Sequence, residues 1–170
     1  NKSNVIEIMN KILDYDNKHS KTIDFNSLLP NGLSFFTTIF LDFDEIKEVS
    51  DFLIVHGADP NIPDKKGQFP LKAAMIIKSM NFVESLLNSN KIDYTKFPYL
   101  HIAVSSCDEK MIKLILDRNL IDVNSINDND ETPLFIACKL NRIDVINLLF
   151  EKDELDFLHR NKNGDDALKI

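Results

Sequence analysis

The chain has 170 residues, of which 44% are hydrophobic, and its formal net charge at pH 7 is −7. This length can bury a continuous core, and no apolar run approaches the roughly 20 residues that a membrane-spanning helix needs. The negative net charge argues against nucleic acid as the default partner, because binding to phosphates needs a basic surface.

The most informative pattern is a spacing that repeats along the chain. Five aspartates are each followed by a bulky apolar residue, in the pairs Asp24 and Phe36, Asp59 and Leu71, Asp93 and Leu100, Asp122 and Leu134, Asp156 and Leu168. The separation is 12 residues in four pairs and 7 in the third, and 22 or 23 residues lead to the next aspartate. A period of roughly 29 to 35 residues is typical of a stack of similar units rather than of one closed globule.

Each period predicts a polar loop followed by two short helices. The first 24 residues contribute mainly one helix, at 5–15. Inner helices are then predicted at 71–77, 100–106 and 134–140. The outer helix after each carries apolar residues at helical spacing: Phe82, Val83, Leu86 and Leu87; Met111, Ile112, Ile115 and Leu116; Val145, Ile146, Leu148 and Leu149. Because such short helices are marginal alone, we expect stacking on neighbours to stabilise them.

The polar loops carry turn and capping signals just before the inner helices. One loop position needs a left-handed backbone, which Gly adopts freely and Asp tolerates. That position holds Gly32, Gly67, Asp130 and Gly164. Pro70 and Pro133 stand in a first helical turn, where no N–H is needed, and Thr132 is placed to cap the helix that follows it.

The residues inside the period resemble the ankyrin-repeat consensus. The similar segments are TPLFIA at 132–137, LHIA at 100–103, GQFPLKAA at 67–74 and HGADPN at 56–61. No segment matches completely, but all keep one register through four successive periods. The resemblance implies an all-α ankyrin-repeat solenoid, in which helix-turn-helix units stack and hairpin loops project.

This resemblance divides residues 1–170 into a single array. An N-terminal cap at 1–24 precedes repeats at 25–59, 60–93, 94–122 and 123–156, and a truncated repeat follows at 157–170. The sequence opens without Met and stops just inside a new repeat, so we expect a piece of a longer protein. With two cysteines and no signal-like start, we expect it to be intracellular, in the cytoplasm or nucleus, with targeting signals that can lie elsewhere.

Several departures from the consensus carry structural expectations. Five residues are missing between Asp93 and Leu100, which predicts that no hairpin forms there and that Pro98 lies near the start of the next helix. The repeat at 25–59 carries an insertion near 42–44, so its first helix should be irregular. Ile92, Ile121 and Leu155 should plug the junctions where the consensus has Ala.

The residues that could carry chemistry favour structural roles. His101 occupies the histidine of the family motif, where it helps to position the hairpins, and it cannot share a helical face with Cys107 six residues later. Cys138 stands where small buried residues pack. The histidines are spread along the chain and the acidic loop around Asp128 lacks the calcium-loop spacing, so we predict no catalytic residue, metal or cofactor.

We therefore predict a monomeric module that binds a partner protein and is not itself an enzyme. The alternative is a recruiting or regulatory segment of a larger enzyme or effector, whose catalytic domain lies outside these residues. The resemblance implies binding through a concave groove with an apolar centre, a basic hairpin and an acidic one. Its expected residues are Lys65, Lys66, Gln68, Ile76, Ile77, Ser105, Ser106, Asp128, Asn129, Glu131, Lys139 and Leu140.

Overall fold

The computed structural model describes residues 7, 9–11, 13–14, 18, 23–38 and 46–169. Two compact units make up the chain: the N-terminal unit, Asn1–Ala74 and Ser79–Ile92, and the C-terminal unit, Met75–Lys78 and Asp93–Ile170. Within the described residues there are helices and turns but no strand, which confirms the predicted all-α class. The described part of the predicted helix at 5–15 is helical, and the rest of that prediction lies outside the described residues.

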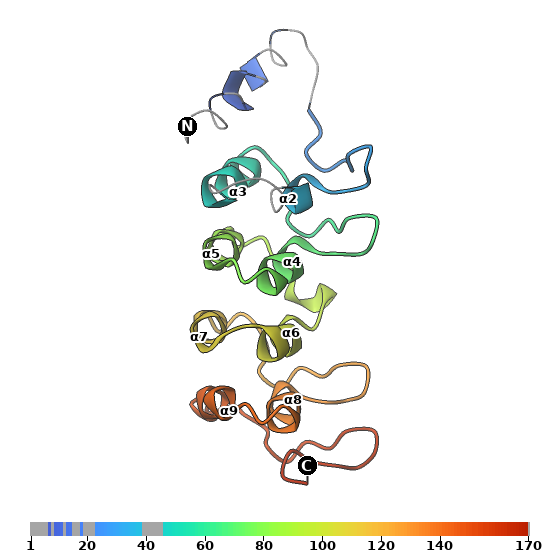
Figure 1. Cartoon of the computed structure of the whole chain (residues 1–170), viewed down its shortest axis with the longest axis vertical. Coiled ribbons are helices and arrows are strands. Elements are labelled where there is room, and N and C mark those ends of the chain that lie inside the picture. The colour runs from blue at the N-terminus through green and yellow to red at the C-terminus, as the bar shows by residue number, and fades with distance from the viewer. Residues whose placement is uncertain are drawn as a thin grey trace. The chain divides into compact units, whose positions relative to one another are not determined.

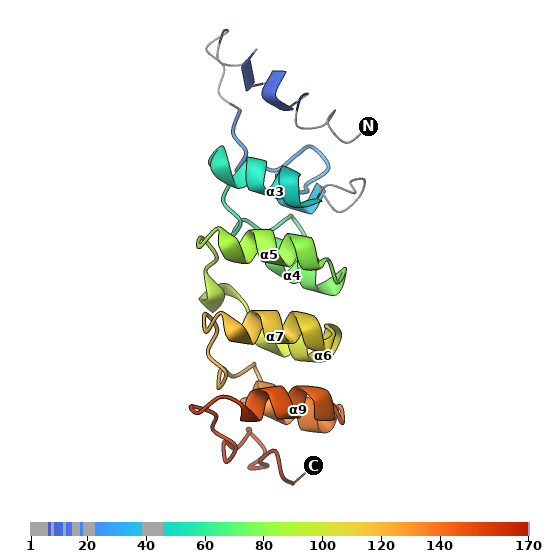
Figure 2. The ribbon, with the colours of Figure 1, turned by 90° about the vertical axis from the view of Figure 1, so that its left-hand side faces the viewer.

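The N-terminal unit is built from helices α2 (Phe35–Thr38), α3 (Ile46–Val55), most of α4 (Pro70–Ile76) and α5 (Met80–Asn88). Helices α3 and α5 pack side by side (Figure 2). Ser85 Oγ joins them by donating to Asp51 Oδ1 at 2.6 Å. The core between them is tight, because Leu53 and Phe82 are almost completely buried. Helix α2 is only four residues long, as expected for an irregular repeat, and the predicted insertion near 42–44 lies outside the described residues.

The C-terminal unit contains the 3₁₀ helix η2 (Tyr94–Lys96) and helices α6 (Tyr99–Ser106), α7 (Glu109–Asp117), α8 (Pro133–Lys139) and α9 (Ile143–Phe150). Helices α6 and α8 form an inner layer, and α7 and α9 form an outer layer (Figure 1). Leu100, Ile112 and Leu149 are fully buried between the layers. The inner and outer helices therefore occur where the apolar spacing predicts them.

Local signals account for the helix starts. The hydroxyl oxygen of Thr132 accepts from Phe135 N at 3.2 Å, with Pro133 in the first turn, which confirms the predicted cap. Asp108 caps α7 in the same way, because its side chain accepts from Met111 N at 2.9 Å. The predicted left-handed loop positions are also confirmed, since Gly32, Gly67, Asp130 and Gly164 all have φ between 57° and 80°.

Three of the five repeated aspartates are followed two residues later by an asparagine, namely Asn26, Asn61 and Asn124, and the side chains of these asparagines bridge neighbouring loops. In the N-terminal unit, Asn61 Nδ2 donates to Lys91 O at 2.7 Å, which lies in the following loop. In the C-terminal unit, Asn124 Nδ2 donates to Glu154 O at 2.6 Å and its Oδ1 accepts from Asp156 N at 2.8 Å. Each bridge spans about one period, so the repeated spacing places complementary amide groups opposite one another.

The junction at Asp93 has the predicted geometry. Asp93 caps η2 by accepting from Thr95 N at 3.0 Å, and Pro98 is the residue that precedes α6. A short 3₁₀ turn therefore stands where the other repeats have a hairpin. The predicted plugs are only partly confirmed, because Ile92 is buried whereas Ile121 and Leu155 are half-buried.

The predicted truncated repeat at 157–170 forms no helix among its described residues, although Leu168 occupies the position that begins an inner helix in the other repeats. Residues 166–169 make a turn, and the side chain of Leu168 is 74% exposed, while Ile170 lies outside the described residues. An inner helix starting at Leu168 would have no outer helix to stack on among the described residues, and isolated short helices are unstable in water.

Candidate functional site

The hairpin at 64–68 presents the predicted basic residues of the N-terminal unit. Asp64 is buried, and its Oδ1 accepts from Lys66 N at 2.8 Å and from Gln68 N at 2.9 Å, so the loop is closed by its own side chain. Lys65, Lys66 and Gln68 are exposed. Lys65 N donates to Gly32 O at 2.9 Å, which fixes this hairpin against the preceding loop.

The hairpin at 127–131 has the same construction in the C-terminal unit. Asn127 Oδ1 accepts from Asn129 N at 2.8 Å and from Glu131 N at 3.0 Å, and the side chains of Asp128 and Asn129 are exposed. Glu131, which we expected to face the groove, is less accessible than Asp128 and Asn129. Its side chain is buried, accepts from Asn127 Nδ2 at 2.9 Å and pairs with Lys139 Nζ at 3.4 Å, and its pKa is held below the usual value mainly by the hydrogen bond from Asn127.

Two histidines hold this hairpin. His101 Nε2 lies 2.7 Å from Glu131 O, and His159 Nε2 lies 2.9 Å from Asp130 O. Because a carbonyl oxygen only accepts, Nε2 of each ring carries the hydrogen. The structural role predicted for His101 is thus observed as a tie between helix α6 and the hairpin that precedes α8.

The buried ring of His101 predicts a pH-dependent stability. Its Nδ1 is buried without a hydrogen-bond partner among the described residues, and burial lowers the pKa from the usual 6.5 despite the bond to Glu131 O. A lowered histidine pKa stabilises the fold fully above 6.5, and that stabilisation is lost as pH falls from 6.5 towards the folded-state pKa. We expect the free energy of unfolding in urea to fall between pH 7.5 and 5.5, and to fall less in His101→Gln. Equal pH dependence in the two proteins would contradict this assignment.

The C-terminal ends of the inner helices form the second predicted group. Ile76, Ile77 and Leu140 are 49%, 46% and 49% exposed, and Ile76 directly follows the fully buried Met75. Ser105 is exposed and Ser106 half-buried at the end of α6, and Lys139 is exposed beside Leu140. All six belong to the C-terminal unit, and we call them the inner-helix ends.

Three hydrogen bonds fix these ends. Cys107 Sγ donates to Met75 O at 3.6 Å, beside Ile76. Arg142 follows Leu140 by two residues, and its Nη1 donates to Val104 O at 3.0 Å and to Cys107 O at 2.7 Å. These bonds satisfy carbonyls that a helix end leaves free. Arg142 was not predicted, because nothing local marks a side chain that reaches carbonyls more than 30 residues earlier.

We expect Arg142→Ala to destabilise the protein by about 2–3 kcal/mol, because it leaves the Val104 and Cys107 carbonyls without their donor. The variant also removes the partner of Asp144, whose pKa is held low mainly by its hydrogen bond from Arg142. Urea unfolding measures the loss. Arg160→Ala, at an exposed site in the same unit, serves as the control and should stay within about 0.5 kcal/mol of the parent. If Arg142→Ala and Arg160→Ala lose the same unfolding free energy, Arg142 contributes only as a surface charge.

A polar hollow of about 290 Å³ lies beside Lys139. Its walls are Glu131, Phe135, Lys139, Asn161, Asn163, Asp165 and Lys169. Two of these, Glu131 and Lys139, were predicted site residues, and the others come from residues that the sequence did not single out. The hollow thus adjoins the inner-helix ends through Lys139.

The described residues give no support to nucleophilic or metal chemistry. Burial raises the pKa of the Cys107 thiol to about 11, so it stays protonated and inert. Cys138 is half-buried, which corrects our expectation that it packs in the core like its neighbour Ala137. Among the described residues no group of three or more His, Cys, Asp and Glu side chains is placed to hold a metal ion.

Comparison with known proteins agrees with this architecture. A family model described as ankyrin repeats in three copies matches residues 43–127 and 100–170, so the chain belongs to the ankyrin-repeat family. The ankyrin repeat domain of Bcl-3, a member of the IkappaB protein family, has the same fold, with a TM-score of 0.78 and 19% identity over 93% of this chain and 71% of that one. Ankyrin repeats are protein–protein interaction modules.

Similar segments occur within larger proteins of different activities. The human transient receptor potential cation channel subfamily A member 1 is 31% identical over 93 residues, which is 52% of this chain and 8% of the channel. A tyrosine-protein kinase of Hydra vulgaris is 30% identical over 94 residues, or 51% of this chain and 12% of the kinase. The chain thus spans about a tenth of these relatives. No helix of the described residues is long and apolar enough to cross a membrane.

Proposed function

We propose that this chain binds a partner protein through the inner-helix ends of its C-terminal unit. The observation that carries the proposal is that Ile76, Ile77 and Leu140, three large apolar side chains at the ends of inner helices, are 46–49% exposed. Exposed apolar surface is unfavourable in water, and its burial by a partner would release about 25 cal/mol per Å². The neighbouring Ser105, Ser106 and Lys139 supply polar contacts at the rim.

Each unit carries a further group of exposed polar residues that we assign to partner binding. In the C-terminal unit, the hollow beside Lys139 and the exposed side chains of Asp128 and Asn129 offer acceptors for polar groups of the partner. In the N-terminal unit, the exposed Lys65, Lys66 and Gln68 form a separate basic contact. The hairpins are closed by their own side chains, so they lose little conformational entropy on binding.

Site-specific photo-crosslinking tests this proposal. A photoreactive residue placed at Ile77 or Leu140 should capture the same partner from extracts of the source cells. The matched control is Phe150 at the end of the outer helix α9, which is 55% exposed and equally apolar. Capture of that partner at Phe150 alone, with none at the inner-helix ends, would place binding on the outer helices.

A second candidate function is regulation or substrate recruitment within a larger enzyme. The similarity to a tyrosine-protein kinase of Hydra vulgaris, of which this chain covers 12%, supports that alternative. The test is to read the complete open reading frame and to assay any catalytic domain with and without these repeats. An encoded catalytic domain whose activity or substrate choice depends on the repeats would favour regulation over simple binding.

A further inference from the structure

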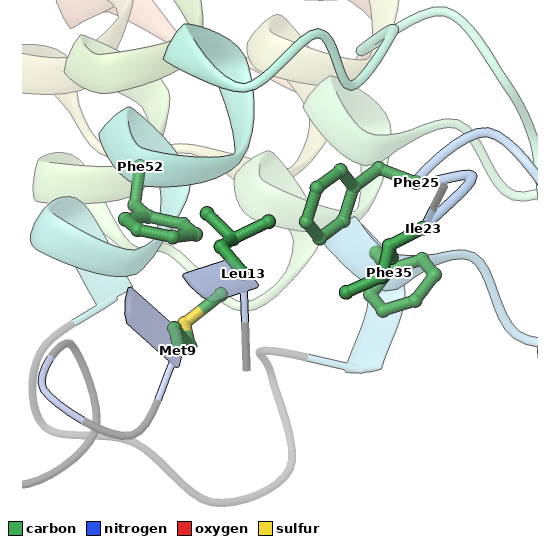
Figure 3. A pocket seen from close by; sticks show the side chains of 6 residues that line it. All are labelled: Met9, Leu13, Ile23, Phe25, Phe35 and Phe52. Carbon is green, nitrogen blue, oxygen red and sulfur yellow. The ribbon is translucent and has the colours of Figure 1, made fainter. Parts of the chain in front are cut away.

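The N-terminal unit contains an apolar pocket that neither the predicted groove nor the proposed surface uses (Figure 3). Its volume is about 240 Å³. It lies where described residues of the predicted N-terminal helix approach α2 and α3, and it is lined by Met9, Leu13, Ile23, Phe25, Phe35 and Phe52. The wall surface is almost entirely apolar.

This space is unusual because the rest of the unit is closely packed. Phe36, Leu53 and Phe82 are at most 2% exposed, and protein interiors rarely leave voids larger than a water molecule. The pocket is partly open to solvent, and its volume is larger than the roughly 150 Å³ of an engineered closed apolar cavity that binds benzene. Water would need two to four polar partners to occupy such a site favourably, and these walls offer almost none.

Three phenylalanines shape the pocket. Phe25 and Phe35 meet edge to face, with their ring centroids 5.3 Å apart. In and just after α3, the rings of Phe52 and His56 stack, with their centroids 4.0 Å apart. These contacts orient the three rings, and Met9, Leu13 and Ile23 complete the walls. Five of the six lining residues are half-buried, which leaves a route for a ligand from solvent.

We propose that this pocket binds a small, uncharged, apolar molecule about the size of one substituted aromatic ring. The volume admits a group somewhat larger than benzene. Burial of a ligand's apolar surface against these walls is favourable. The six lining residues provide no side-chain carboxylate, ammonium or amide to orient a polar ligand. A charged ligand would lose its hydration without a compensating partner.

The three rings raise one competing ligand class, the quaternary ammonium ions that aromatic cages bind. Phe is a weaker cation–π partner than Trp, and the other walls here are aliphatic or thioether groups. Among the residues that the structure describes, no acidic side chain lines the pocket. The geometry therefore favours the neutral ligand over a cation of the same shape.

The test uses methyl-labelled methionine and NMR on the whole chain. Of the four methionines, only Met9 lines the pocket, while Met75 and Met111 are buried elsewhere. Titration with toluene should shift the Met9 methyl signal saturably and leave the Met75 and Met111 signals in place. No saturable Met9 shift, or equal shifts at all four signals, would overturn the proposal.

Variants and an isosteric pair sharpen this result. Leu13→Phe should narrow the pocket and weaken the toluene-dependent shift, whereas Leu28→Phe, at an exposed leucine outside the pocket, should preserve it. The neutral 3,3-dimethylbutan-1-ol should bind at least about tenfold more tightly than choline, which has the same shape but carries a charge. Tighter binding of choline would overturn the proposal that the ligand is uncharged. If Leu13→Phe fails to fold, the toluene titration of the wild-type protein remains the test of binding in the pocket.

Discussion

Replacing Ile77 and Leu140 together by aspartate is expected to weaken partner binding by about 4 kcal/mol, or roughly a thousandfold in Kd. Each residue is about half exposed, so each can act as an apolar anchor worth about 2 kcal/mol while contributing little to the core. Calorimetric titration with the partner identified by crosslinking measures the loss.

The folded state should survive this double substitution. Both side chains reach solvent in the free protein, so the new carboxylates stay hydrated and helicity and melting should be nearly unchanged. Phe150→Asp makes the same chemical change at an exposed apolar site on the outer helix α9 and should bind normally. A double variant that unfolds would show that Ile77 and Leu140 belong to the core, and one that binds normally would move the binding surface elsewhere.

Phe82→Ala is expected to cost about 3–5 kcal/mol of unfolding free energy, the largest stability effect we foresee. The Phe82 ring is completely buried in α5 and stacks on Phe36 with centroids 6.5 Å apart. Its removal loses the transfer free energy of the ring and leaves a cavity that a close-packed unit fills poorly.

Urea unfolding, with Phe150→Ala as the exposed control, measures the cost of the Phe82 substitution. Phe82→Leu should lose less than Phe82→Ala, because it retains most of the buried volume. If Phe82→Ala loses no more unfolding free energy than the control, the N-terminal unit must relax to fill the cavity.

The sequence predicts those parts of the fold that depend on local physics. The positive φ of Gly67 and Asp130, and the cap from Thr132, follow from properties of single residues or close neighbours. The replacement of the hairpin after Asp93 by a shorter turn follows from a count, since only seven residues separate Asp93 from Leu100 where the other pairs have 12. Asn90, Asn119 and Asn141 also adopt positive φ, and their residue type was a signal that could have been used.

The rest depends on contacts between residues far apart in sequence. Glu131 carries a charge and stands in a loop, yet Asn127 and Lys139 provide the partners that allow its burial. Arg142 reaches carbonyls of the preceding repeat. The apolar pocket arises where Phe35 and Phe52 meet residues from two other segments, and no periodicity encodes that meeting.

The measurement that tests partner binding at the inner-helix ends most directly is hydrogen–deuterium exchange with and without the bound partner. Slower exchange should appear at the ends of α4, α6 and α8, around residues 76–77, 105–106 and 139–140. The outer helices α7 and α9 should exchange at unchanged rates, because their exposed faces lie outside the proposed surface. Protection confined to α7 and α9 would contradict the proposed site.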